Sequence, residues 1–326
     1  GCTDSLALNF DPLANTDDST CCGASIPIPF GNQIGEDING LYAGDQFGES
    51  ISFSSDGNIV AVGTRNSDVG GNNSGQVRVF QRDFSTALGW TQLGQNINGG
   101  PADNCGRSVS ISSDGQTVAI GCPEQDPGHV RVYQYNNNYW YQLGVNIIGE
   151  VTGNPPPGGF DELFGRSVSI SSDGQTVAIG SPGNDGAGTN AGHVRIYDYD
   201  GSSWTQVGND INGEDPGDYS GRSVSLSSDG NTVAIGAPSN RAAAGHVRVY
   251  QRDINTSLGW IQLGDDIDGE YAGTSNHNMA GESGHSVSLS SDGNTVAIGA
   301  PYNDGGSAGT DAGHVRVYQR DVNTSL

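Results

Sequence analysis

The sequence predicts an all-β fold, a β-propeller of five blades that each contain four antiparallel strands. One segment, typified by Ser-Val-Ser-Leu-Ser-Ser-Asp-Gly-Asn-Thr-Val-Ala-Ile-Gly-Ala-Pro, occurs five times at intervals of 56–63 residues. The copies are centred on Asp56, Asp114, Asp173, Asp229 and Asp292. Glycine, at 52 of 326 residues, falls between the alternating segments of each copy, where turns are expected. A period of this length is typical of stacked supersecondary units.

The fourth copy illustrates the four strands. Residues 222–227 alternate polar and apolar side chains, which is the period of a strand. Asp229-Gly230 favours a tight turn, and residues 231–236 form the returning second strand. Residues 246–250 predict the third strand and residues 260–264 the fourth, and a turn is expected at 266–269.

The two ends of the repeat region complement each other. Residues 30–40 match a fourth strand and its turn without the first three strands, and residues 314–319 match a third strand without a fourth. Pairing of residues 30–38 with residues 314–319 would close a ring of five blades and remove exposed sheet edges. The alternative is that the chain is a fragment of a larger, seven-bladed propeller.

Residues 164–182 and 192–197 resemble the FG-GAP repeat of integrin α-subunit propellers, and Phe47-Gly48 opens the first copy in the same way. The resemblance covers residues 30–326 and implies the propeller fold. Many members of the family carry an Asp-rich calcium loop between the first two strands. Here that place holds only Ser-Ser-Asp-Gly, and one carboxylate does not supply the roughly six to eight oxygens that calcium takes. We therefore expect no calcium in the blades.

The first 22 residues resemble a short Cys-bounded repeat of secreted microbial surface proteins, which implies an extracellular module. The predicted organisation is this module at 1–22, a linker at 23–29 and the propeller at 30–326. Five side chains with oxygen atoms inside the module favour either one bound calcium ion or a set of turn-capping residues. They are Asp4, Asn9, Asp11, Asp17 and Asp18. No other cofactor is predicted.

The five cysteines predict two disulfides. Cys105 and Cys122 flank the hairpin at Asp114-Gly115 and lie almost opposite each other, and Cys2 and Cys21 bound the N-terminal module. Cys22 is left over, either as a free thiol or as a crosslink to another molecule. Disulfides imply an oxidising compartment, so we expect an extracellular or cell-surface protein.

The formal net charge of −24 argues against nucleic acid and anionic membrane surfaces as partners, because both attract basic patches. No apolar run reaches the length of a membrane span, so no membrane insertion is expected. Three sequons predict glycosylation in a secretory route. Their asparagines are Asn72, Asn255 and Asn323.

Three residue types recur at fixed repeat positions, and each has a structural and a functional interpretation. The recurring histidines have two interpretations: each bonds to the backbone of its own blade, or together they form a metal-binding ring. They are His129, His193, His246 and His314. Arginines expected to pair with carboxylates or carbonyls between blades are Arg78, Arg131, Arg195, Arg248 and Arg316. We expect the recurring aromatic residues to pack between blades rather than to stack on sugars. They are Phe30, Trp90, Trp140, Trp204 and Trp260.

The function predicted first is a non-enzymatic extracellular structural or adhesive protein whose partners are other extracellular proteins or copies of itself. Nearly identical blades favour a scaffold, because an active site needs asymmetry. The alternative is a carbohydrate-binding, lectin-like propeller with glycan partners. A glycoside hydrolase ranks third, because it needs two carboxylates that meet at one site. The sequence does not place its apparent off-pattern acids together; these are Glu124, Asp161, Glu162 and Glu282.

Overall fold

The computed structural model describes residues 33–125, 127–150, 162–240, 244–256, 258–270, 281–303 and 311–321. The chain divides into two compact units, of which one contains residues 1–38 and 83–90 and the other contains residues 39–82 and 91–326. All five sheets belong to the second unit, apart from the first residue of one strand.

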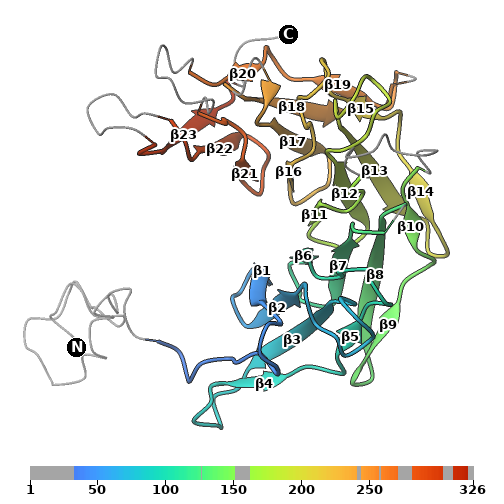
Figure 1. Ribbon diagram of the computed structural model, residues 1–326, viewed down its shortest axis with the longest axis vertical. Helices are drawn as coiled ribbons and strands as arrows, with labels where there is room; N and C mark the ends of the chain where they lie inside the picture. The colour runs from blue at the N-terminus through green and yellow to red at the C-terminus, as the bar shows by residue number, and fades with distance from the viewer. Residues whose placement is uncertain are drawn as a thin grey trace, which may run out of the picture. The chain divides into compact units, whose positions relative to one another are not determined.

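Five antiparallel sheets follow one another along the chain as the blades of a β-propeller (Figure 1). The first contains β1 (Phe47–Phe53), β2 (Ile59–Thr64), β3 (Gln76–Arg82), β4 (Trp90–Gln92) and β5 (Ile97–Asn98). The second contains β6 (Ser108–Ile111), β7 (Thr117–Cys122), β8 (His129–Asn136), β9 (Tyr139–Gln142) and β10 (Ile147–Ile148). The third contains β11 (Ser167–Ile170), β12 (Thr176–Ser181), β13 (His193–Tyr199), β14 (Trp204–Gln206) and β15 (Ile211–Asn212). The fourth contains β16 (Ser223–Leu226), β17 (Thr232–Ala237), β18 (His246–Arg252), β19 (Trp260–Gln262) and β20 (Ile267–Asp268). The fifth contains β21 (Ser286–Leu289), β22 (Thr295–Ala300) and β23 (His314–Gln319).

The four-strand prediction holds in the first four sheets, with one addition. The segment expected to be a turn after the fourth strand forms a two-residue strand, because its backbone pairs with the start of the third strand. In the fourth sheet, Asp268 pairs with His246 and Ile267 with Val247. The outer position of each blade is therefore shared by two short strands.

The repeated Ser-Ser-Asp-Gly turn is held by its own side chains. Asp114 Oδ1 accepts hydrogen bonds from Ser112 Oγ at 2.6 Å and from the Gln116 amide at 2.9 Å, and Ser112 Oγ accepts one from the Thr117 amide. Equivalent bonds hold the turns at Asp56 and Asp292, where the first serine lowers the pKa of each carboxyl to about 2. The carboxylate therefore accepts hydrogen bonds from its own turn and stabilises the turn.

Neighbouring blades are joined by hydrogen bonds between the turns that follow their innermost strands. The Ser113 amide donates to Ser172 O at 3.0 Å, and the same bond joins Ser55 to Ser113, Ser172 to Ser228 and Ser228 to Ser291. The serine hydroxyls of these strands also bond to the next blade, as Ser167 Oγ does to Gly221 O at 2.8 Å. The serines of the repeat therefore connect each blade to the next by hydrogen bonds.

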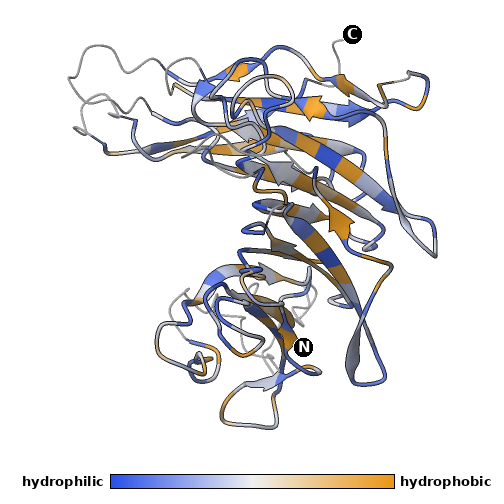
Figure 2. Ribbon diagram, turned by 45° about the vertical axis from the view of Figure 1, so that its right-hand side comes forward, coloured by the Kyte–Doolittle hydropathy of each residue, from blue (hydrophilic) through white to orange (hydrophobic). Residues whose placement is uncertain are grey.

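The apolar core is divided among the blade junctions. In each junction, the aliphatic side chains of one second strand pack against the next blade, as Ala178 does against Val233 and Ile235. Figure 2 shows the corresponding alternation of hydrophobic and hydrophilic residues along the strands. Burial of this alternating set fixes the register of each hairpin, because a slip of one residue would turn the apolar side chains to the opposite face.

The fifth sheet contains the three strands that the sequence predicts for the C-terminal repeat. Within the described residues, β23 pairs with β22 alone, so this sheet has three strands. Val315 and Val317 on β23 are 69% and 65% exposed. Closure of the ring through residues 30–38 stays a prediction, since residues 30–32 lie outside the described part.

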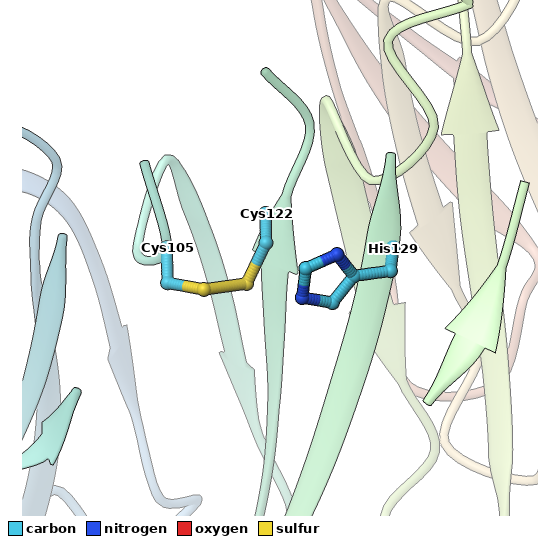
Figure 3. Close-up of side chains that lie close together, drawn as sticks. All are labelled: Cys105, Cys122 and His129. Atoms are coloured by element: carbon cyan, nitrogen blue, oxygen red, sulfur yellow. A yellow bond between two sulfur atoms is a disulfide. The ribbon is translucent and has the colours of Figure 1, made fainter. Parts of the chain in front are cut away.

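The second blade contains the disulfide between Cys105 and Cys122 that the sequence predicts. Both cysteines are buried, and Figure 3 shows the bond beside the ring of His129. The pairing follows from the hairpin register, in which Ser108 lies opposite Gly121. Because these sulfurs are bonded to each other, they provide no thiolate that would join His129 in a metal site.

Replacing both cysteines by alanine is expected to lower the free energy of unfolding by about 3 kcal/mol, because the bond closes a loop of 17 residues. Urea unfolding followed by tryptophan fluorescence measures this loss. A reductant should lower the free energy of unfolding of the wild type by the same amount, and it should leave that of the double variant unchanged at this disulfide. An unchanged unfolding midpoint in the double variant would contradict the prediction.

Candidate functional site

The repeated arginines form a polar layer between blades, as the sequence predicts. Arg195 on β13 donates to Asp210 Oδ1 at 2.9 Å and Oδ2 at 2.8 Å and also contacts Glu150 of the preceding blade. Arg248 donates to Asn212 O of the preceding blade at 2.6 Å. These guanidinium groups therefore hold the outer ends of neighbouring blades together.

His193 and His246 form no hydrogen bond with the described backbone of their own blade, so that interpretation is wrong for these two histidines. His193 and His246 are at most 1% exposed, and their nearest polar partners are carboxylates of the inter-blade layer. Within the described part of the chain, both ring nitrogens of His246 lack a hydrogen-bond partner. The sequence shows that these positions repeat, but only the packing shows which acids face them.

A buried acid beside His193 is the site residue that the sequence interpretation missed. Glu162 is 1% exposed, and its Oε1 lies 3.5 Å from both His193 Nε2 and Asn184 Nδ2. Its position, three residues before the glycine that precedes the first strand, holds an acid in four of the five repeats. These are Asp45, Asp103, Glu162 and Asp218. Glu162 therefore belongs to the repeat pattern, and this spacing was the signal that would have found it.

Glu162 and His193 have pKa values shifted in opposite directions. Burial raises the pKa of Glu162 to about 7, against the opposing charge of Arg195. Burial also lowers the pKa of His193 to about 4, and the Arg195 charge adds to that shift. Both groups are therefore neutral near pH 5, which avoids a charge on either side chain at this buried position.

Replacing Glu162 by glutamine is expected to change how stability depends on pH. In the wild type, the Glu162 carboxyl binds more protons in the folded state than in the unfolded state between pH 4.5 and about 7. Its contribution to the free energy of unfolding is therefore fully present below pH 4.5 and is lost as the pH rises through 7. The E162Q variant should gain stability relative to the wild type over this window, by up to about 3 kcal/mol. Urea unfolding at pH 4.5, 6 and 7.5 measures the difference, and parallel pH curves would contradict it.

The tryptophans fill apolar sockets between blades, as the sequence predicts. Trp260 is 4% exposed and its Nε1 donates to Val207 O of the preceding blade at 3.0 Å. Trp140 and Trp204 make the same bond to Leu93 O and Leu143 O. These side chains are therefore parts of the core rather than sugar-stacking platforms.

The equivalent socket of the fifth blade has no tryptophan among the described residues. It is an apolar cavity of about 310 Å³ whose lining includes Leu263, Ile267, Leu289 and Tyr318. A Cβ atom added to Gly264 would meet nothing within 4 Å, whereas the same atom on Gly94 would meet the Trp140 ring. The cavity lies where a fourth strand would pair with β23.

The N-terminal segment repeats the local structure that follows a fourth strand. Gln33 Nε2 donates to Asp37 Oδ1 at 2.8 Å, as Gln262 does to Asp266. Trp90 Nε1 donates to Ile34 O at 3.1 Å. Gln33 is thus equivalent to Gln92, two residues after Trp90, so the tryptophan position corresponds in sequence to Gly31 and not to Phe30. The alignment of Phe30 with the tryptophans is corrected by one residue.

Three arginines precede neighbouring innermost strands at one repeat position, namely Arg107, Arg166 and Arg222. Arg107 pairs with Glu49, whereas Arg166 and Arg222 form no ion pair with any residue that the structure describes. Burial lowers the pKa of Arg166 to about 9, and repulsion from Arg222 and Arg107 adds to the shift. This arginine cluster is an anion-attracting feature in a chain of strongly negative net charge.

The other predicted acids do not gather at one site. Glu124 pairs with Arg65 at 3.0 Å, and Glu282 contacts His285 at 3.1 Å. Asp161 lies outside the described residues. No pair of carboxylates that would suit a glycoside hydrolase is assembled from the described members of this set.

Several predicted sites lie outside the described residues. They are Cys2, Cys21, Cys22, Asn323 and the calcium candidates Asp4, Asn9, Asp11, Asp17 and Asp18. Asn72 and Asn255 are exposed, and glycosylation at both stays a prediction. No helix in the described part of the chain has the length and apolar character needed to cross a membrane.

Comparisons with known proteins agree on the repeat and the fold. Residues 156–197 match the family model described as "FG-GAP repeat". The search of curated proteins found no match to this chain.

Solved structures with a similar fold include the periplasmic gluconolactonase PpgL of Pseudomonas aeruginosa, with a TM-score of 0.51 and 18% identity over 85% of this chain and 73% of that one. A protein from Lactobacillus plantarum has a TM-score of 0.51 and 16% identity over 86% and 72% of the two chains. A functionally unknown protein from Desulfotomaculum acetoxidans has a TM-score of 0.50 and 15% identity over 89% and 75%. At these identities the likeness concerns the fold alone, so the comparisons identify a β-propeller in which residues 156–197 are an FG-GAP repeat.

Proposed function

We propose that this chain is a non-enzymatic, extracellular structural or adhesive protein that joins a second polypeptide by accepting one of its strands at the fifth blade. The observation that carries the proposal is the apolar socket beside β23, whose outer edge pairs with no strand that the structure describes. An extended segment bound there would form main-chain hydrogen bonds with β23 and bury an aromatic side chain. The Cys105–Cys122 disulfide supports an oxidising, extracellular location.

The occupant of the socket is a strand with an aromatic residue, and this chemistry argues for a second polypeptide. Trp140, Trp204 and Trp260 each fill such a socket with Nε1 bonded to a backbone carbonyl, and Trp90 makes the equivalent bond to Ile34 O. The chain's own segment at residues 33–38 corresponds to a strand with Gly31 at that position. A second copy of this repeat type offers Trp-x-Gln-Leu-Gly, the sequence found at Trp90 and closely matched at Trp260.

Binding of a peptide tests the proposal. A synthetic peptide with the sequence of residues 257–264 is titrated into the full chain by calorimetry, and the matched control peptide has alanine in place of its tryptophan. We expect one peptide to bind per chain and the control to bind at least about tenfold more weakly, because the tryptophan supplies most of the buried apolar area. Equal binding of both peptides, or no binding together with a monomeric protein, would overturn the proposal and favour closure by the chain's own strand.

Binding of acidic glycans is the second candidate function, and the arginine cluster favours it. Arg166 and Arg222 have no ion-pair partner among the described residues, and guanidinium groups bind carboxylate and sulfate oxygens in pairs. An array of neutral, uronic and sulfated glycans tests this function with R166Q/R222Q, and R252Q is the control because Arg252 pairs with Asp198 away from the cluster. Binding of acidic glycans that is lost only in the double variant would support it, and equal binding by all variants would reject it.

A further inference from the structure

The outer ends of blades three and four present an open hollow with an unusual set of side chains. The hollow has a volume of about 570 Å³, and its lining includes Glu214, Gln262, Asp265, Asp266 and Asp268. Behind it lies His246 on β18, which is fully buried. A cluster of acids alone is common on an acidic protein, so the histidine is the informative member.

The ring of His246 faces two of these carboxylates without a hydrogen bond to either. His246 Nδ1 lies 4.0 Å from Glu214 Oε2 and 3.9 Å from Asp266 Oδ2. Neither ring nitrogen has a hydrogen-bond partner among the residues that the structure describes, although a buried imidazole normally has one. The unpartnered nitrogen therefore points to a ligand that bridges the gap between the three side chains.

From this arrangement, we propose that Glu214, His246 and Asp266 bind a divalent transition-metal ion, with zinc as the best fit. The three ligand atoms all lie within 4.8 Å of one another. Two ligands that are each about 2 Å from one zinc ion lie at most about 4 Å apart, so small side-chain shifts bring these atoms into range. The imidazole favours zinc over calcium, which takes oxygen ligands.

The position of the ring suits this role. A neutral imidazole binds zinc through a ring nitrogen, and His246 Nδ1 faces both carboxylates. Three protein ligands and an open side toward the hollow match a zinc site that retains water in its fourth position. Gln262 donates to Asp266 Oδ1 at 2.8 Å and leaves Oδ2 facing the histidine, which orients the carboxylate.

The third blade provides an internal comparison. Its equivalent residues are Glu150, His193 and Asp210, but Arg195 contacts both carboxylates and bonds to both oxygens of Asp210. In the fourth blade, Arg248 is bonded to Asn212 O, and its distance to Glu214 is 3.6 Å. The carboxylates of the fourth blade are therefore less fully neutralised, which is why the site is assigned to this blade.

Calorimetric titration of the full chain with zinc chloride tests the site. The variants are H246Q and D266N, and the matched control is H193Q in the third blade. We expect H246Q and D266N to lose one equivalent of bound zinc, or to bind it at least about tenfold more weakly, while H193Q retains it. Any zinc bound elsewhere in the chain is bound by all variants, so it does not affect the difference between them.

Cobalt is the second probe, because its visible absorption reports the ligands directly. The wild type should show d–d bands of a four- or five-coordinate ion with nitrogen and oxygen ligands, and H246Q should lack them. Circular dichroism verifies that each variant is folded, and D266N, at the partly exposed carboxylate, provides the readout if H246Q unfolds. Absence of zinc binding in the wild type, equal binding in H246Q and D266N, or equal loss in H193Q would overturn the assignment.

Discussion

Replacing Trp260 by alanine is expected to lower the free energy of unfolding by about 4 kcal/mol. The side chain is 4% exposed, packs in the junction between blades three and four, and donates from Nε1 to Val207 O. The substitution leaves a cavity of indole size and one backbone carbonyl without its partner. Urea unfolding followed by circular dichroism measures the loss, since removal of a tryptophan alters fluorescence.

A matched control lies in the same blade. Ile254 is 86% exposed, so its replacement by alanine removes an apolar side chain without opening a cavity. We expect I254A to change stability by no more than about 0.5 kcal/mol. Similar losses in W260A and I254A would show that the tryptophan socket contributes little to the cohesion of the blades.

Replacing Gly180 by alanine is expected to cost about 3 kcal/mol, because the added methyl group has no room. A Cβ atom at this position on β12 would lie 2.0 Å from Gly221 O in the next blade and 2.3 Å from Ser167 Oγ. A backbone carbonyl cannot move aside without separating the two innermost strands. Urea unfolding measures the cost in the full chain.

Gly299 is the matched control, since it holds the same position on β22 of the fifth blade. There the three described atoms nearest to an added Cβ atom all belong to Ser286, and the one that would clash is Oγ at 2.4 Å, which can rotate away. We expect G299A to lose less than about 1 kcal/mol. A loss as large as that of G180A would show that another sheet packs on the fifth blade, as in a ring closed by residues 30–38.

The hairpins could be predicted from the sequence because their information is local. The Asp-Gly turns and the two-residue alternation place Ser108 opposite Gly121, and this register brings Cys105 to Cys122. The packing of the tryptophans and the pairing of the arginines also followed from repetition. Any side chain that recurs once per blade at a half-buried strand position meets the neighbouring blade in the same way each time.

The candidate site could be predicted less well, because its contacts join loops of different blades. Glu162 was interpreted as an acid outside the pattern, although its spacing from Gly165 repeats that of Asp103 from Gly106. The histidines were expected to bond to the backbone. Their carboxylate partners come from two blades: beside His246, Glu214 belongs to the preceding blade and Asp266 to the same blade. Sequence periodicity gives the position of each residue within a blade but not the neighbour it meets across the junction.

The repeating β-sheet of this protein can be predicted from its sequence, because its turns, its alternation and its small innermost residues all lie within some 60 residues. The differences between blades are visible only in the packed structure, where the described residues leave a socket in the fifth blade and give the His246 imidazole no hydrogen-bond partner. The physical reason is that hydrogen bonds within a hairpin depend on residues close in sequence. The charge, burial and volume at a junction depend on side chains that two separate blades bring together.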